Sequence, residues 1–267
     1  MKKNIPVSFE FIYQLFSLLI IIIIVHAVYV AVIRPNADAF LATQAALMQK
    51  DPTYVNQQSA FVLIRDYEQE ACFILMLWAL AIMTYKGIAI IKHRALLQLD
   101  LLPLGKSMRI LPEDTRDLSR AVQALPPEQQ KALLPRALLA ALQRFSSTRN
   151  IQDVSEAMHV YCASEGERLD VELSMIKYIA WAIPSIGFIG TVRGISQALG
   201  HAHKAVEGDI FDVTLNLGVA FNSTLIALLI SIVLMFLLHQ LQLIQERYVL
   251  DTEAYCEEKL TRHLHTR

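Results

Sequence analysis

Charged side chains are scarce in this sequence. Asp, Glu, Lys and Arg make up 18% of the 267 residues, and the formal net charge at neutral pH is −1. A protein that binds nucleic acid through its phosphates needs an excess of basic residues, which this chain lacks. We therefore expect no nucleic-acid partner.

Patterns that would indicate catalysis, redox chemistry or metal binding are also missing. The chain has three cysteines, Cys72, Cys162 and Cys256, whose wide spacing fits neither a disulfide framework nor a metal site. No glycine-rich phosphate loop, Ser-His-Asp arrangement or carboxylate pair in an apolar setting is present. We predict that the protein is not an enzyme, that it has no cofactor or metal, and that its thiols serve packing.

Apolar residues, in contrast, are abundant and form four long runs. They account for 54% of the chain, and the runs cover about 11–33, 71–91, 177–200 and 214–240. Roughly 20 apolar residues in a helix cross the hydrocarbon core of a bilayer. We predict an all-α integral membrane protein with four transmembrane helices and a helical cytoplasmic insert between spans 2 and 3.

The first run could also belong to a signal peptide, because Lys2 and Lys3 precede it and Ala37-Asp38-Ala39 resembles a cleavage site. The run at 11–33 is longer than the apolar region of about 7–15 residues in such peptides. We expect it to be retained as a transmembrane helix.

The distribution of basic residues predicts the orientation. Residues 92–175 carry eleven Lys and Arg, whereas residues 34–70 carry three. Positive loops favour the cytoplasmic side. We expect a multi-pass protein of the bacterial inner membrane with both termini and the 92–175 insert in the cytoplasm, and with 34–70 as an external helical link.

These patterns divide the chain into four parts. Residues 1–91 contain the first two spans and the external link, 92–175 form the cytoplasmic helical domain, 176–243 contain spans 3 and 4, and 244–267 form a cytoplasmic C-terminal helix.

In the external link, Arg34-Pro35-Asn36 and Asp51-Pro52 predict two helix breaks. From Ser59 a helix is expected to run directly into the second span.

The cytoplasmic insert is expected to start with short helices at 113–124 and 127–145, with Pro135 kinking or dividing the second. Apolar residues at three- and four-residue steps predict one long helix over 151–180 that merges with the third span. An extension of the fourth span, Gln242 to Lys259, is expected beside it.

Hydroxyl residues stand deep inside the last two runs. Thr191 lies in the third, and Ser223 and Thr224 lie in the fourth. Helical spacing places Ala220, Thr224, Ala227 and Ser231 on one face of the fourth helix. Such a stripe is typical of close helix packing, but it also fits the wall of a narrow ion pathway. Both interpretations remain open at this point.

The third run combines a proline with a glycine face. Gly187, Gly190 and Gly194 lie close to one side of the predicted helix and would let a neighbouring helix approach closely. Pro184 is expected to bend the helix and to leave the carbonyl of Ala180 without its helical partner.

Arg193 is the unusual charge of the third run. It is two residues, or about 200°, from Thr191, so the two cannot face the same narrow pore. Arg193 would then face a neighbouring helix or extend outward toward Glu207, Asp209 or Asp212. We expect a structural ion pair, and the alternative is direct control of permeation as a gating charge.

The four runs contain no acidic residue, and His26 is the candidate for proton transfer well inside them. A proton pathway normally needs such a group. Either the chain does not conduct protons, or a partner supplies the carboxylate.

The third and fourth runs together resemble the MotA/TolQ/ExbB family of bacterial inner-membrane channel subunits. The likeness extends from 165 to about 249, and its most specific segment contains Pro184, Gly187, Gly190, Thr191, Val192, Gly194 and Ile195. Thr224 matches the threonine that the family places in its pore. Two early spans and a cytoplasmic insert before the last pair are similar to the four-span MotA arrangement.

The resemblance implies a homopentamer around two copies of a single-span partner similar to MotB, TolR or ExbD, which brings an aspartate into the pore. H⁺ or Na⁺ flow would then drive rotation, which makes the chain a stator subunit of a motor protein. Thr191, Thr224, Ser223, Ser231 and Pro184 would belong to the ion pathway. The helix-packing positions would be Gly187, Gly190, Gly194, Ala220 and Ala227.

The sequence departs from the family pattern at Val219, where TolQ- and ExbB-like chains have a membrane glutamate, and at Asn222 and Arg193. A non-conducting membrane scaffold is the alternative function, followed by a stand-alone transporter, although no internal repeat supports the latter.

Overall fold

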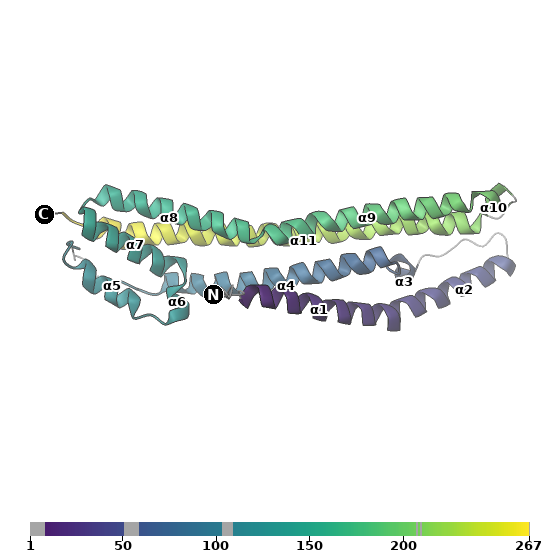
Figure 1. Ribbon diagram of the computed structural model, residues 1–267, viewed down its shortest axis with the longest axis horizontal. Helices are drawn as coiled ribbons and strands as arrows, with labels where there is room; N and C mark the ends of the chain where they lie inside the picture. The colour runs from purple at the N-terminus through teal and green to yellow at the C-terminus, as the bar shows by residue number, and fades with distance from the viewer. Residues whose placement is uncertain (1–8, 51–58, 103–108, 207, 209, 267) are drawn as a thin grey trace, which may run out of the picture. The chain divides into compact units, whose positions relative to one another are not determined.

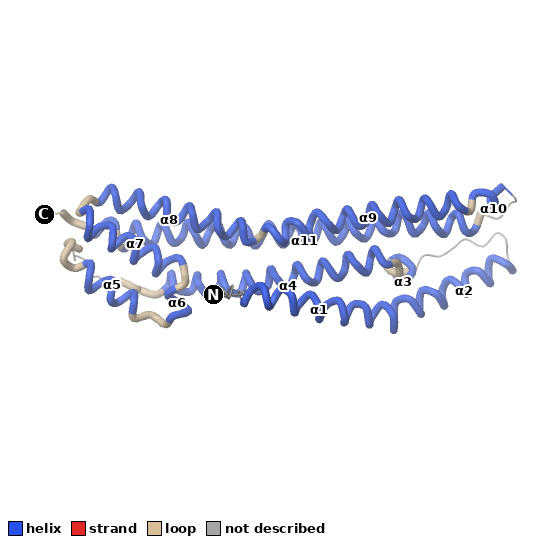
Figure 2. Tube along the Cα trace, in the orientation of Figure 1, coloured by secondary structure: helices blue, strands red, loops and turns tan. Residues whose placement is uncertain are grey.

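The computed structural model describes residues 9–50, 59–102, 109–206, 208 and 210–266. These residues form helices and connecting turns but no strand, and one isolated bridge pairs Ile110 with Leu264 (Figures 1 and 2). The longer helices are α1 (Phe9–Val28), α2 (Arg34–Lys50), α4 (Tyr67–Ala95), α5 (Thr115–Gln123), α7 (Leu133–Thr148), α8 (Ile151–Glu172), α9 (Ser174–Gly200) and α11 (Phe211–Lys259). The shorter elements are η1 (Tyr29–Ile33), α3 (Ala60–Leu63), η2 (Leu96–Gln98), α6 (Pro127–Gln130), α10 (Ala202–Val206) and η3 (Thr261–His263).

Four helical segments are long and apolar enough to cross a membrane. They are Glu10–Leu47, Tyr67–Gln98, Ile151–Gly200 and Phe211–His263, and each contains one of the predicted apolar runs. The prediction of an all-α membrane protein with four spans is therefore confirmed.

The chain divides into two compact units. The first consists of Met1–Met83 and Met175–Leu238, and the second of Thr84–Ser174 and His239–Arg267. The first unit contains most of each apolar run, and the second contains the predicted cytoplasmic insert with the end of α11.

In the first unit, α1 lies along α4. The hydroxyl of Tyr13 donates to the carbonyl of Ala81 at 3.3 Å, and Nε1 of Trp78 donates to the carbonyl of Gln14 at 3.0 Å. The outward faces of α1, α9 and α11 carry many exposed large apolar side chains, among them Ile23 and Trp181. A bilayer covers such faces, so their exposure agrees with a membrane bundle.

The helix break predicted at Arg34-Pro35-Asn36 is wrong. The chain passes from α1 through the π turn η1 into α2, and the N–H of Arg34 bonds the carbonyl of Tyr29, five residues earlier. Pro35 has no N–H to donate, and a wider turn just before it accommodates this loss without ending the helix. The second predicted break, at Asp51-Pro52, lies outside the described residues.

The helix from Ser59 does not run directly into the second span. Ser59 caps α3 by accepting a hydrogen bond from the N–H of Phe61 at 3.3 Å, but α3 ends at Leu63. A short non-helical segment follows, and α4 begins at Tyr67, four residues before the predicted apolar run. The first turn of α4 therefore includes Glu68 and Glu70.

The second unit is built around α7, whose inward residues Leu134, Leu138, Leu142 and Phe145 are fully buried at helical spacing. Pro135 does not divide the helix over 127–145, because the division falls at Lys131 and Ala132 and Pro135 stands in the first turn of α7. Proline is tolerated there, since the first helical N–H groups have no partner within the helix.

The expected single helix over 151–180 is interrupted. α8 ends at Glu172, Leu173 bonds back to Asp170 and Val171, and α9 starts at Ser174. The extension of the fourth span to Lys259 is confirmed, because α11 is continuous from Phe211 to Lys259.

Candidate functional site

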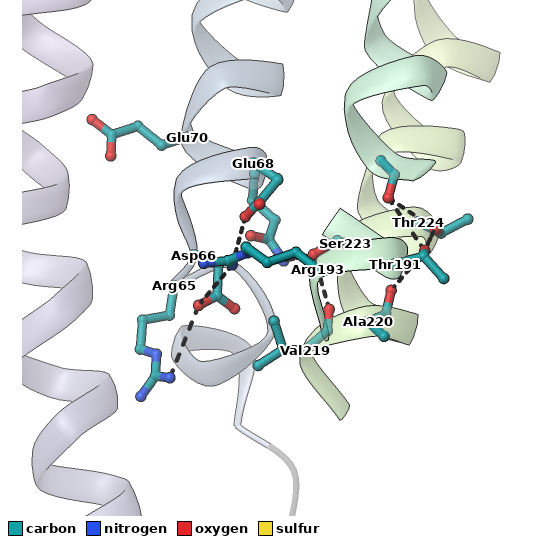
Figure 3. A network of polar contacts seen from close by, with 12 residues as sticks. Arg65, Asp66, Glu68, Glu70, Thr191, Arg193, Val219, Ala220, Ser223 and Thr224 are labelled. Atoms are coloured by element: carbon teal, nitrogen blue, oxygen red, sulfur yellow. Dashed lines mark hydrogen bonds and ion pairs between the residues drawn. The ribbon is translucent and has the colours of Figure 1, made fainter. Parts of the chain in front are cut away.

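Two threonine hydroxyls meet at the contact between α9 and α11. Oγ1 of Thr191 lies in direct hydrogen-bond contact with Oγ1 of Thr224 (Figure 3). Thr191 Oγ1 is also 3.1 Å from the carbonyl oxygen of Ala220, and Thr224 Oγ1 is 3.1 Å from that of Gly187. Each hydroxyl has a single proton and several possible acceptors, so the pair can exchange donor and acceptor roles without moving its heavy atoms.

The glycines of α9 allow this contact. A Cβ added at Gly187 would lie 2.5 Å from the Cβ of Ala227, and one at Gly190 would lie 2.5 Å from the Cβ of Ser223. At Gly194 it would lie 2.7 Å from the backbone nitrogen of Ala220. No carbon atom fits at these distances, so the three glycines set how closely α9 and α11 approach, and thereby the distance between the two threonines.

The proline of α9 has the structural consequence expected for Ala180. Pro184 stands inside the helix, and the carbonyl of Ala180 accepts a hydrogen bond from Oγ of Ser231 at 3.3 Å. A side chain of α11 thus replaces the backbone donor that Pro184 lacks.

Arg193 has different partners from those expected. Its Nη2 atom is 2.7 Å from Oε2 of Glu68 and 3.8 Å from Oδ1 of Asp66 (Figure 3). Asp212 instead pairs with Lys204 at 2.6 Å, while Glu207 and Asp209 lie outside the described residues. The expected partner set was incomplete because it overlooked the carboxylates at the start of α4.

Thr191 and Arg193 point to different sides of α9. Thr191 faces α11, and Arg193 faces the start of α4 (Figure 3). The charge is therefore kept away from the hydroxyl pair, as an angle of about 200° between the two residues requires.

Three consecutive polar residues in the first turn of α4 were missed by the sequence analysis. Glu68, Gln69 and Glu70 are all buried. Nε2 of Gln69 donates to Oγ of Ser223 at 3.4 Å, so α4 contacts the residue next to Thr224. Acidic residues directly before an apolar run are a recognised signal of a helix start, and this signal would have placed them inside the helix.

Glu70 belongs to a separate ion pair. Its Oε1 atom is 2.7 Å from Nδ1 of His26, and its other oxygen contacts the guanidinium of Arg34. The histidine of the first span thus pairs with a carboxylate from the same subunit.

No group of three or more His, Cys, Asp or Glu side chains that could hold a metal ion occurs in the part of the chain that the structure describes. The hydroxyl pair, which can both donate and accept hydrogen bonds, is the candidate site because it joins the last two spans. Such groups can coordinate a monovalent cation, orient water or hydrogen-bond a carboxylate.

Four membrane-length helices, with hydroxyls paired where the last two meet, define a multi-pass membrane protein with a polar contact inside its bundle. The sequence model of the MotA/TolQ/ExbB proton channel family matches residues 129–254. This match supports the suspected family and, in general terms, an ion-channel type of function. Comparison with curated proteins and with solved structures gives no match.

The matched segment includes α7, α8, α9 and nearly all of α11, and with them both threonines. It does not include α4. The contacts of Glu68 with Arg193 and of Gln69 with Ser223 therefore join the matched segment to α4, which lies outside it.

Proposed function

We propose that this protein is a stator-type ion-channel subunit that couples H⁺ or Na⁺ flow across the bacterial inner membrane to rotary mechanical work. The observation that carries the proposal is the direct contact between Thr191 and Thr224, within the segment that matches a proton channel family. It gives the last two spans a pair of exchangeable hydrogen-bonding groups, which supports an ion pathway through them.

The pathway needs a titratable group that these helices do not provide. Apart from Asp212 in the first turn of α11, the parts of α9 and α11 in the first unit contain no Asp or Glu. We propose that a single-span partner similar to MotB, TolR or ExbD brings an aspartate to the hydroxyl pair. Thr191 and Thr224 would hydrogen-bond this carboxylate or the water around it, and so favour its charged form.

The link from ion binding to movement would run through Pro184. A helix with an internal proline lacks one backbone hydrogen bond and bends more easily at that point. Ser231 replaces the missing bond from the neighbouring helix. A change in charge near Thr224 would then alter the bend of α9 relative to α11.

We propose an assembly of five copies of this chain around two copies of the partner, with both termini and residues 92–175 in the cytoplasm. Support comes from the family and from the eleven basic residues of 92–175. A ring of five would place Thr191 and Thr224 of every subunit around the partner's spans.

The test compares Thr224→Val, which keeps the shape but removes the hydroxyl, with Thr224→Ser, which keeps the hydroxyl. In the complex with its partner, Thr224→Val should reduce ion flux by about ten- to hundredfold, as loss of a hydrogen bond to a charged group implies. Thr224→Ser should retain most of the flux, and both variants should assemble normally.

Ser185→Ala provides the matched control, because this exposed hydroxyl of α9 bonds only the carbonyl of Trp181 among the described residues. Normal flux in Thr224→Val would remove the hydroxyl pair from the pathway. A wild-type complex without any proton or sodium flux would favour a non-conducting membrane scaffold instead.

A further inference from the structure

A cavity of about 210 Å³ lies in the first unit beside the start of α4. It is lined by residues of α2, α3, α11 and the segment before α4, and its polar groups include Arg65, Asp66 and Asn222. Thr214 at its edge is exposed. Because one water molecule occupies about 30 Å³ of the liquid, the cavity has room for several.

Two buried polar side chains lie directly behind the cavity wall. Leu63 and Val219 line the cavity, and their carbonyl oxygens accept hydrogen bonds from Nε2 of Gln69 at 3.3 Å and from Oγ of Ser223 at 2.9 Å. Gln69 is 0% exposed and Ser223 is 1% exposed. Gln69 and Ser223 are thus bonded to residues that line the cavity, and Ser223 is next to Thr224 in the chain.

Two buried polar atoms near the cavity have no hydrogen-bond partner among the described residues. They are Oε1 of Gln69 and Nε of Arg193. The donor role of Gln69 Nε2 toward the carbonyl of Leu63 fixes the orientation of the amide, so Oε1 is an unpaired acceptor. A buried acceptor and a buried donor without partners are satisfied most simply by bound water.

Asp66 is the lining group of the cavity that can attract a cation. Arg65 lies 3.3 Å from Asp38 and 3.9 Å from Asp66, and Arg193 joins Asp66 to Glu68. Among the residues that line the cavity, Asp66 is the carboxylate and Arg65 is the guanidinium. Burial raises the pKa of Asp66, while Arg65, Arg193 and Arg34 act in the opposite direction and Glu68 adds to the increase.

We propose that this cavity is a water-filled entry vestibule for the permeating cation, with Asp66 as the carboxylate that receives it and Gln69 and Ser223 at its inner end. The inference rests on the proposed channel function and assigns the outer part of the pathway to helices of a single subunit. It involves α2, α3 and α4, which the family match does not include.

If the cation is a proton, Asp66 takes it up from one water molecule and releases it to another. Hydronium transfers its proton to a carboxylate oxygen of Asp66 and leaves water. The new O–H bond then breaks as the proton passes to a water molecule of the vestibule, which restores hydronium and the carboxylate. A sodium ion would instead exchange part of its hydration shell for the carboxylate oxygens.

The vestibule can be tested by thiol labelling of the full complex in spheroplasts, in a background where Cys72, Cys162 and Cys256 are replaced by alanine. Asn222→Cys places a thiol in the cavity, and Gly218→Cys is a second probe with open space around its Cβ. Membrane-impermeant methanethiosulfonates of positive or negative charge are applied from the periplasmic side. Both thiols should react, and the cationic reagent should react about tenfold faster when each rate is divided by that reagent's rate with a free thiol.

Asp66→Asn should remove this charge preference without preventing the reaction. Phe221→Cys is the matched control, because Phe221 is next to Asn222 but 66% exposed on an apolar face of α11, where charged reagents should not reach it. The proposal is overturned if neither cavity thiol reacts from this side, or if both reagents react equally fast.

The labelling result is independent of ion flux. If the thiols show the charge preference while Thr224→Val conducts normally, the vestibule stands and the proposed pathway through the hydroxyl pair is wrong. If flux depends on Thr224 but the cavity thiols resist both reagents, the vestibule alone is wrong.

Discussion

The guanidinium of Arg193 on α9 is bound to the carboxylate of Glu68 on α4, with 2.7 Å between Nη2 and Oε2. The arginine of the third span is therefore neutralised by a residue 125 positions earlier in the chain. This contact connects the start of α4 to the helix that carries Thr191. The structural ion pair expected for Arg193 is thus part of a link between helices, although its partner is Glu68.

We predict that Glu68→Gln destabilises the protein by about 2 kcal/mol, because it leaves Arg193 half-buried with a weaker partner. Arg193→Gln should have a similar effect, and the double variant should lose less than the sum of the two. The measurement is a double-mutant cycle on unfolding in detergent or nanodiscs.

The exposed pair Arg94 and Asp251 is the control for this cycle. Its atoms are 2.8 Å apart, but the two side chains are 47% and 46% exposed, so its coupling should remain below about 1 kcal/mol. Equal coupling in the two pairs would mean that Glu68 and Arg193 are no more than a solvated surface contact.

The glycine face of α9 gives a second prediction. Gly187→Ala should destabilise the helix pair by about 1–3 kcal/mol, because the new Cβ would overlap that of Ala227. Adding Ala227→Gly should restore part of the loss. Gly166→Ala in α8, where nothing lies within 4 Å of the added Cβ, should stabilise its helix by about 1 kcal/mol.

Thermal unfolding of these variants provides the measurement. If Gly187→Ala and Gly166→Ala shift the transition in the same direction, α9 and α11 do not approach as closely as described.

The third prediction concerns Pro184 and Ser231. Ser231→Ala should cost about 1 kcal/mol, because the carbonyl of Ala180 loses its donor. In a Pro184→Ala background the backbone N–H returns to residue 184 and can bond Ala180 itself. Ser231→Ala should then cost little. Equal cost in both backgrounds, measured by unfolding, would show that Ser231 does not replace the missing backbone bond.

A fourth prediction follows from Asp66. Its pKa is raised by burial, so the folded state holds the proton more tightly than the unfolded chain. The stability contributed by this protonation is fully present below the unfolded pKa of about 3.9 and is lost as pH rises through the folded pKa. Wild type should therefore gain stability relative to Asp66→Asn as pH falls from 7 to 4. A difference that is constant with pH, or that changes in the opposite direction, would contradict the burial of Asp66.

Periodicity and hydropathy were sufficient to predict the four spans and the long extension of α11, because both depend on local composition. The helix boundaries were harder to predict. Pro35 indicated a break, but a π turn before it keeps the helix continuous. The break at Leu173 carries no proline or glycine and could not be read from the sequence.

The sequence predicted which residues form the candidate site, but it did not predict which of them touch one another. The sequence placed Thr191 and Thr224 inside neighbouring spans, yet their distance depends on the glycine contacts between α9 and α11. The roles of Glu68 and Gln69 were missed because they stand before the apolar run, and only the fold brings them to Arg193 and Ser223.

The central claim is that this chain forms a channel only together with a partner that supplies a carboxylate. Native mass spectrometry of the tagged chain, gently extracted from the membranes of its own host, tests this most directly. We expect five copies of the chain with two copies of a small single-span protein that carries an aspartate within its span. A stable monomer or dimer without such a protein would contradict the account and would leave a scaffold or a transporter as the function to pursue.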